Sequence, residues 1–151
     1  MLELARSEDR EVINSLAREV HAMHVSWRPD IYEMPEELYP EERFRAAIGK
    51  RELYAARIGG VTVGYVLLRI CSSASTGLVK RKVMLVDEIC VEKACRNRGV
   101  GKEMMADVRV LAKAFGCTDM QLGVYPQNDE AVSFYQKCGF VIQNISMQRK
   151  V

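Results

Sequence analysis

A short stretch of the chain, residues 95–102, reads "CRNRGVGK" and combines two glycines with three basic side chains. It follows "VMLVDEICV", whose apolar and β-branched residues are typical of a strand. The backbone N–H groups of such a turn, at the start of a helix, can surround the oxygens of a diphosphate, and glycine lets the anion approach them. The stretch therefore predicts a phosphate site formed by Arg96, Asn97, Arg98, Gly99, Val100, Gly101 and Lys102.

Two well-known phosphate loops do not match this turn. The dinucleotide fingerprint GxGxxG requires a third glycine at the position of Met104. The nucleoside triphosphate loop requires a glycine at the position of Arg96 and a serine or threonine at that of Glu103. Neither a Rossmann site nor a nucleoside triphosphate site is expected.

Other residue types that support catalysis or metal binding lack suitable partners. His21 and His24 are three positions apart on a predicted helix, but no acidic residue or cysteine has metal-site spacing, so solvent or loop contacts and no metal are expected. The five cysteines are scattered without a CxxC pair, which indicates reduced thiols. Cys90 and Cys138 are interpreted as buried thiols, and the absence of GxSxG argues against a serine hydrolase.

Composition indicates a globular protein without a general affinity for polyanions. A chain of 151 residues fits one domain, residues 1–151, and 48% hydrophobic with 28% charged residues is ordinary for a globular chain. The net charge of +2 gives no general attraction to nucleic acid or to acidic membranes. Charges occur too early for a signal peptide and no apolar run approaches the roughly 20 residues of a membrane helix, so a cytoplasmic location is expected.

The hydrophobic periodicity changes along the chain between that of helices and that of strands. Ser7 is a candidate N-cap for the first helix, and Gly59-Gly60 a candidate hairpin turn. A proline-bounded loop, residues 26–40, and a polar loop, residues 72–81, interrupt the pattern. Helices are predicted near residues 7–25, 41–49, 99–116 and 129–138, and strands near 2–5, 52–58, 61–71, 82–91, 119–125 and 140–151.

The turn and its surroundings together resemble the GNAT superfamily of N-acetyltransferases. "VDEICV" enters the turn, and "NDEAVSFYQKCGF" follows a later strand, with the matching positions at Asn128, Ala131, Phe134, Tyr135, Gly139 and Phe140. The similarity is specific from about Val86 to Phe140, whereas residues 1–82 match only in the order of elements. It implies an α/β (α+β) fold, with a mixed, mostly antiparallel sheet of six to seven strands flanked by about four helices.

The resemblance also implies the co-substrate and its contacts. In the family the glycine-rich turn binds the pyrophosphate of acetyl-coenzyme A, and the later helix lies beside the pantetheine arm, where Asn128 and Ala131 would contact it. Backbone N–H groups from Ile89 through Cys90 to Val91 would stabilise the oxyanion of the transition state. The implied activity is transfer of an acetyl group to a primary amine by direct attack in a ternary complex.

Two proton transfers need side chains. An alkylamine has a pKa of about 10, so a base should remove its proton, and Asp87 and Glu88 are the candidates. Consecutive strand residues point to opposite faces, so one carboxylate is expected in the cleft; parity with Ile89 and Val91 favours Asp87, acting through water. Alternatively, both carboxylates only bind a cationic substrate, or one pairs with a lysine. Tyr135 shares a helix face with Asn128 and, by resemblance, protonates the departing thiolate.

The sequence indicates less about the acceptor amine and about other partners than about the co-substrate. Trp27 and Tyr32 flank "RPD", where they either stack on an acceptor or anchor the loop, and Tyr125 is a similar candidate. The acceptor is expected to be a small-molecule or peptide amine, and a homodimer is considered. A non-catalytic acetyl-coenzyme A sensor is an alternative. A nucleic-acid binder using Arg96, Arg98, Lys102 and the basic run 80–82 is another, although the small net charge argues against it.

Overall fold

The computed structural model describes residues 1–73 and 76–151, so residues 74–75 of the predicted polar loop lie outside the described residues. Two 3-10 turns, η1 (Ser7–Asp9) and η2 (Lys93–Cys95), accompany the main elements. These are β1 (Leu2–Leu4), α1 (Arg10–Trp27), α2 (Glu41–Gly49), β2 (Leu53–Ile58), β3 (Val61–Ser73), β4 (Arg81–Val91), α3 (Val100–Ala114), β5 (Asp119–Leu122) and α4 (Asp129–Lys137).

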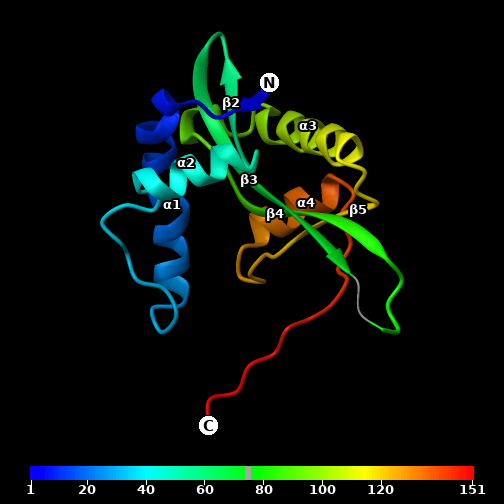
Figure 1. The fold of residues 1–151 in the computed structure, drawn as a ribbon. Helices are drawn as coiled ribbons and strands as arrows, with labels where there is room; N and C mark the ends of the chain where they lie inside the picture. The colour runs from blue at the N-terminus through cyan, green and yellow to red at the C-terminus, as the bar shows by residue number, and fades with distance from the viewer. Residues whose placement is uncertain (74–75) are drawn as a thin grey trace.

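The five strands form one sheet in the order β1-β2-β3-β4-β5 (Figure 1). Neighbours are antiparallel except β4 and β5, which are parallel, so the predicted mostly antiparallel sheet is confirmed. Gly59 and Gly60 have φ angles of 57° and 83°, which non-glycine residues rarely adopt, and they form the predicted hairpin turn. Ser7, however, lies inside η1 rather than at a helix cap; there the Asp9 carboxylate accepts the Arg6 N–H at 2.7 Å.

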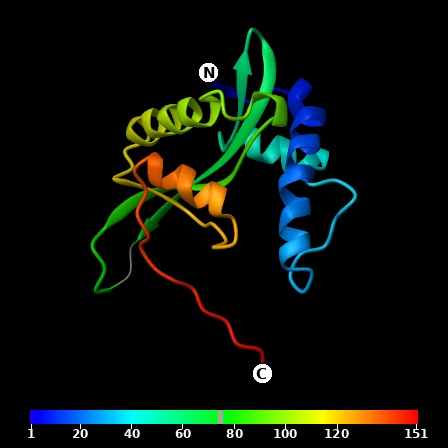
Figure 2. The ribbon, with the colours of Figure 1, turned by 180° about the vertical axis from the view of Figure 1, so that it is seen from behind.

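The helices cover both faces of the sheet. On one face, α1 and α2 contribute Ile13, Leu16 and Phe44 to a buried cluster with Leu53 and Tyr65 of the sheet. On the other face, α3 and α4 pack on a cluster that contains Val66, Met84, Val86, Met104 and Val108 (Figures 1 and 2). Because each helix buries one apolar stripe against the sheet, the two faces have separate cores and separate surroundings for polar side chains.

A β-bulge in β4 changes which side chains face each core. Leu67 lies opposite Glu88 and Leu68 opposite Val86, so Asp87 is an extra residue without a partner on β3. Val86 packs in the α3 and α4 core, whereas Glu88 points to the α1 and α2 face. The pairing of β4 with β5 also ends at Val86, so the two strands diverge from the bulge onward among the described residues.

The C-terminal segment, residues 140–151, is not the strand that its sequence predicts. It leaves the body of the protein in an extended path after Gly139, whose φ is 91° (Figure 1). A strand requires a neighbouring strand to pair with, and no strand in the described part of the chain pairs with this segment. The structure therefore has five strands where six to seven were expected, and β5 is shorter than predicted because the chain diverges from β4 after Leu122.

Candidate functional site

The predicted anion turn leaves backbone N–H groups available at the start of α3. Asn97 and Gly99 have φ angles of 60° and 86°, so the chain reverses direction sharply before the helix. The first α-helical bond joins the Glu103 N–H to the Gly99 carbonyl at 3.0 Å, so the N–H groups of residues 100–102 have no acceptor within the helix. A Cβ at Gly99 would meet no atom within 4 Å, so the space in front of the turn is open. Such a helix start suits an anion.

The basic side chains of the turn have two different environments. Arg96 donates to the Val91 carbonyl at 2.8 Å and to the Glu19 carboxylate at 3.2 Å, which ties the turn to β4 and α1. Arg98 and Lys102 are exposed and form no ion pair with another residue in the described ranges. These two side chains are therefore the ones available to an anionic ligand.

Gly101 has a packing role that the sequence did not indicate. A Cβ built on it would lie 3.2 Å from Cζ and 3.3 Å from Cε2 of the Phe134 ring, and 3.8 Å from Cγ2 of Val91. A Cβ at this position would press on the Phe134 ring, so glycine allows α3 and α4 to approach each other closely there. The role of Gly101 at the phosphate site stays a prediction.

The edge of β4 beyond the bulge presents free backbone groups. The Glu92 N–H donates to the Val63 carbonyl of β3 at 2.8 Å, and antiparallel pairing alternates, so Cys90 also bonds toward β3. Ile89 and Val91 then direct their N–H groups to the opposite edge, where β5 has diverged. Cys90 itself is buried as predicted, and burial raises the pKa of its thiol to about 11.

Glu88 is held by three donors on the α1 and α2 face. The Tyr39 and Tyr65 hydroxyls each donate to Oε2 at 2.8 Å, and Arg43 Nη2 donates to Oε1 at 2.9 Å. The Arg43 guanidinium also lies 4.2 Å from the centre of the Tyr39 ring. Burial, followed by the nearby Glu88 charge, raises the pKa of both phenols above the ordinary value, so they remain donors.

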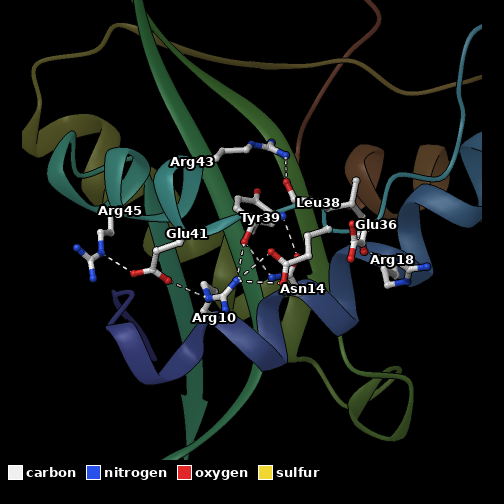
Figure 3. A network of polar contacts seen from close by, with 10 residues as sticks. Arg10, Asn14, Arg18, Glu36, Leu38, Tyr39, Glu41, Arg43 and Arg45 are labelled. Atoms are coloured by element: carbon white, nitrogen blue, oxygen red, sulfur yellow. Dashed lines mark hydrogen bonds and ion pairs between the residues drawn. The ribbon is translucent and has the colours of Figure 1, made fainter.

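The position of Tyr39 depends on α1, as Figure 3 shows. Asn14 Nδ2 donates to the Tyr39 carbonyl at 3.0 Å, and the Tyr39 N–H donates back to Asn14 Oδ1 at 2.8 Å. Arg10 holds the same loop through Glu37 at 3.1 Å. Asn14, Tyr39 and Arg43 were not predicted from the sequence; the signal for them is polar side chains on α1, in the loop before α2 and in α2 itself.

Asp87 and Glu88 both line one open cavity of about 440 Å³ on this face. The Arg69 guanidinium donates to both oxygens of the Asp87 carboxylate, from Nε to Oδ2 and from Nη2 to Oδ1, the latter at 2.9 Å. The lining combines cationic and anionic side chains with a small apolar part: Arg43, Ala46, Ala47, Lys50, Glu52, Leu67, Arg69, Asp87 and Glu88.

The predicted orientation of the two carboxylates is therefore wrong. Simple alternation places Asp87 with Ile89 and Val91 and turns Glu88 away. Because Asp87 is an extra residue at the bulge, the alternation of faces shifts by one position there. Both carboxylates therefore reach the same cavity, while Ile89 and Val91 pack toward the α3 and α4 core. The alternative in which one carboxylate pairs with a lysine does not hold either, because Glu88 pairs with Arg43 and Asp87 with Arg69.

The three aromatic residues proposed for the acceptor lie together. The Tyr32 and Tyr125 hydroxyls are 2.8 Å apart, and the Trp27 ring centre lies 6.3 Å from that of Tyr125. They join the end of α1, the loop after it and the segment after β5. The His24 ring lies within the same cluster, 5.3 Å from Tyr32 and 5.7 Å from Tyr125 between ring centres.

The two histidines have different environments. His21 Nε2 is 2.8 Å from the Glu33 carbonyl, so the predicted loop contact is confirmed. For His24, burial and then the neighbouring His21 lower the pKa below 6.5, although the charge of Glu88 acts in the opposite direction.

The residues predicted on α4 lie at its start and end. Asn128 caps the helix by accepting the Ala131 N–H at 3.2 Å, as one of its two suggested roles requires. The Tyr135 ring packs between those of Phe134 and Phe140, with centres 5.2 Å and 5.9 Å away. Burial, and to a lesser degree Cys138, raises the pKa of Tyr135 to about 12, so the phenol is protonated at neutral pH.

Two kinds of feature are absent from residues 1–73 and 76–151. No three side chains with metal-binding groups come together there. No helix in this part of the chain combines the length and hydropathy required to cross a bilayer.

A mixed sheet whose parallel strands diverge above a glycine-rich turn is the architecture of GNAT proteins. Residues 19–140 match the acetyltransferase (GNAT) family, and this chain belongs to that family.

The relatives include proteins named as N-acetyltransferases. The chain is 30% identical over 95 residues to the uncharacterized N-acetyltransferase YvbK of Bacillus subtilis, and 30% identical over 96 residues to glucosamine 6-phosphate N-acetyltransferase 1 of Oryza sativa. These matches cover 62% and 54% of this chain, respectively, and 56% of each relative. The chain thus spans little more than half the length of these relatives.

Solved structures share the fold over the whole chain. A mutant of the BH1408 protein of Bacillus halodurans superposes with a TM-score of 0.92 at 24% identity, covering 100% of this chain and 99% of that one. The aminoglycoside N-acetyltransferase AAC(6')-Iy, in complex with CoA, superposes with a TM-score of 0.67 at 18% identity and the same coverage. At these identities the comparisons concern the fold.

Proposed function

We propose that the protein transfers the acetyl group of acetyl-coenzyme A to a primary amine by direct attack in a ternary complex. The observation that carries this proposal is the divergence of β4 from β5 at the Asp87 bulge. Along β4 it places, in order, two carboxylates, the free edge at residues 89–91, and the turn before α3. These are the groups needed for an amine, a thioester carbonyl and a diphosphate.

The residues of the turn fit acetyl-coenzyme A. The N–H groups of residues 100–102, with Arg98 and Lys102, would hold the pyrophosphate. The N–H groups of Ile89 and Val91 would orient the thioester and stabilise negative charge on its oxygen. The Asn128 amide would bind the pantetheine arm in addition to capping α4.

Two proton transfers, from the ammonium of the acceptor and to the departing thiolate, would use side chains of this protein. Asp87 or Glu88 would take the proton from the ammonium through water, and the other carboxylate would help to hold the amine. Glu88 accepts hydrogen bonds from three residues, whereas Asp87 is bound by Arg69 alone in the described part of the chain, which favours the holding role for Glu88 and the proton-accepting role for Asp87. Tyr135, protonated at neutral pH, would donate to the departing thiolate.

The mixed charge of the cavity favours an acceptor that also carries an acidic group. Asp87 and Glu88 would face the amine, while Lys50, which forms no ion pair among the described residues, would face a carboxylate or phosphate. Glucosamine 6-phosphate, for which one relative is named, has both groups. The aromatic cluster of Trp27, Tyr32, Tyr125 and His24 would border the acceptor on its other side.

Calorimetry tests the co-substrate site. Wild-type protein should bind acetyl-coenzyme A, and Arg98→Glu should weaken binding by about tenfold or more because a phosphate contact becomes a repulsion. Arg109→Glu is the matched control, since Arg109 is an exposed base further along α3. Absence of binding by the wild type would contradict the proposed function.

An acceptor panel scored by acetylated product in mass spectrometry tests the transfer. The panel pairs amines with and without an acidic group, such as glucosamine 6-phosphate with glucosamine. The acidic member should react at least about tenfold faster in kcat/KM, and Lys50→Gln should reduce that ratio. Equal rates would contradict the acceptor class alone, whereas acetyl-coenzyme A binding without any product would favour a sensing module.

A further inference from the structure

The cavity at the β4 bulge carries as many cationic as anionic side chains. Three of each kind line it: Arg43, Lys50, Arg69, Glu52, Asp87 and Glu88. Electrostatic complementarity therefore favours a ligand that has one ammonium and one acid group over a ligand that has an ammonium alone. Which cation receives the acid group depends on how firmly each of them is already held.

Arg43 is held by several groups at once. Its Nη1 donates to the Leu38 carbonyl (Figure 3), its Nη2 donates to Glu88 Oε1 at 2.9 Å, and the guanidinium lies 4.2 Å from the centre of the Tyr39 ring. Glu88 is in turn fixed by the Tyr39 and Tyr65 hydroxyls, each at 2.8 Å. An incoming anion would have to break these contacts together, so the pair of Arg43 and Glu88 stays closed.

Arg69 has a single partner. Its side chain is 54% exposed, and among the described residues its guanidinium donates to Asp87 alone. An ion pair this exposed contributes little to stability, because water competes for both charges. The backbone of Arg69 is fixed in β3 opposite Leu85 of β4, so the guanidinium can change its partner without a change in the sheet. Arg69 is therefore the cation that is available to an acid group.

The Asp87 carboxylate stands where the acid group of an acceptor would bind. Two nitrogens of the Arg69 guanidinium donate to its two oxygens, and a guanidinium binds any carboxylate or phosphate in this arrangement. While this pair is closed, an amine competes with the guanidinium for both oxygens, and the ammonium form is repelled by the positive charge. An acid group on the acceptor removes both obstacles, because it takes over Arg69 and leaves Asp87 to the amine.

We propose that Arg69 recognises the acid group of the acceptor, and that the resulting exchange of ion pairs releases Asp87 to the amine. This inference rests on the proposed acetyl transfer and names the residue that selects the acceptor. Lys50 on α2 would add a point charge at the same cavity, whereas the planar fork of Arg69 would fix the orientation of the acid group. An amine without an acid group would meet a carboxylate that is still paired.

Opposite effects on two matched amines test this exchange. The pairs are glucosamine 6-phosphate with glucosamine, and alanine with alaninamide, which separate a phosphate from a carboxylate as the acid group. In a pair that reacts, Arg69→Met should lower kcat/KM for the acidic amine about tenfold to a hundredfold, because hydrogen bonds to a charged group are lost. For the neutral amine, kcat/KM should rise about twofold to fivefold, because Asp87 is no longer paired. A fall for both amines, or no change for either, would overturn the proposal.

Arg45→Met is the matched control. Arg45 is also an exposed arginine in an ion pair, with Glu41, but it does not line the cavity. Its replacement should leave kcat/KM unchanged for both amines. An effect equal to that of Arg69→Met would overturn the assignment to Arg69.

Binding without acetyl transfer is followed through the Arg69 Nε–H signal in NMR, which is identified by its absence from Arg69→Met. Titration with the acidic amines should shift this signal, and titration with their neutral counterparts should not. A shift without any acetylated product would support the role of Arg69 and contradict the proposed function. Absence of a shift with both acidic amines would overturn the role of Arg69, and acetylated product in that case would leave the proposed function standing.

Discussion

Tyr39→Phe isolates the hydrogen bond between a buried phenol and Glu88. The ring of Tyr39 is fully buried and packs edge-on against Phe44 and Tyr65, with ring centres 6.4 Å and 5.9 Å away. Phenylalanine keeps these contacts and removes only the hydroxyl that donates to Oε2 at 2.8 Å. A hydrogen bond to a charged group contributes about 1.5–3 kcal/mol, so the free energy of unfolding should fall by about that amount.

Tyr54→Phe is the matched control for this change. Tyr54 is 4% exposed, and its hydroxyl is buried without a hydrogen-bond partner in the described part of the chain. Removal of an unsatisfied hydroxyl should leave the free energy of unfolding unchanged or raise it by about 1 kcal/mol. Urea unfolding of both variants measures the difference. Equal destabilisation, or a greater loss for Tyr54→Phe, would refute the reasoning about Glu88.

Three further predictions concern titrating groups. Burial and His21 disfavour the His24 imidazolium, so the stabilising contribution of neutral His24 is complete above pH 6.5 and is lost as the pH falls. NMR should show that His24 titrates with a pKa below 6.5. A pKa above 6.5 would contradict the effect of burial. Iodoacetamide should alkylate exposed Cys71 well before Cys90, whose pKa is raised to about 11, and equal rates would contradict this order. Tyr135→Phe should retain acetyl-coenzyme A binding and lower turnover about tenfold to a hundredfold; unchanged turnover would make Tyr135 a packing residue.

Local patterns predicted most of the elements. The apolar stripe through Ile13, Leu16 and Ala17 does form the buried face of α1, and Gly59-Gly60 does form the hairpin turn. These features depend on neighbours within one or two turns of chain. Trp27, Tyr32 and Tyr125 were inferred separately as acceptor residues, and they lie in one cluster.

The positions of the two carboxylates could not be predicted in this way. Alternation along β4 is broken by one extra residue, and the bulge depends on how Leu67 and Leu68 pair with β4 rather than on the sequence around Asp87. Tyr39 was likewise unremarkable as a loop residue before a proline. Its contact with Glu88 spans 49 positions and depends on the packing of the loop against α1.

The prediction of a strand at residues 140–151 was wrong for a related reason. The alternation of residues 140–151 describes a segment able to form a strand, but a strand exists only when an edge is available to it. In the described part of the chain, residues 140–151 pair with no edge of the sheet.

The pH dependence of acetyl transfer by Asp87→Asn and Glu88→Gln tests the central claim most directly. With an accepted amine, thiol release should fall most near neutral pH in the variant that lacks the base. It should recover in part toward the amine pKa of about 10, where the free amine is abundant. Asp87→Asn is expected to behave in this way, and Glu88→Gln to lose rate evenly. Unchanged rates in both variants would contradict the assignment of the site to the β4 bulge.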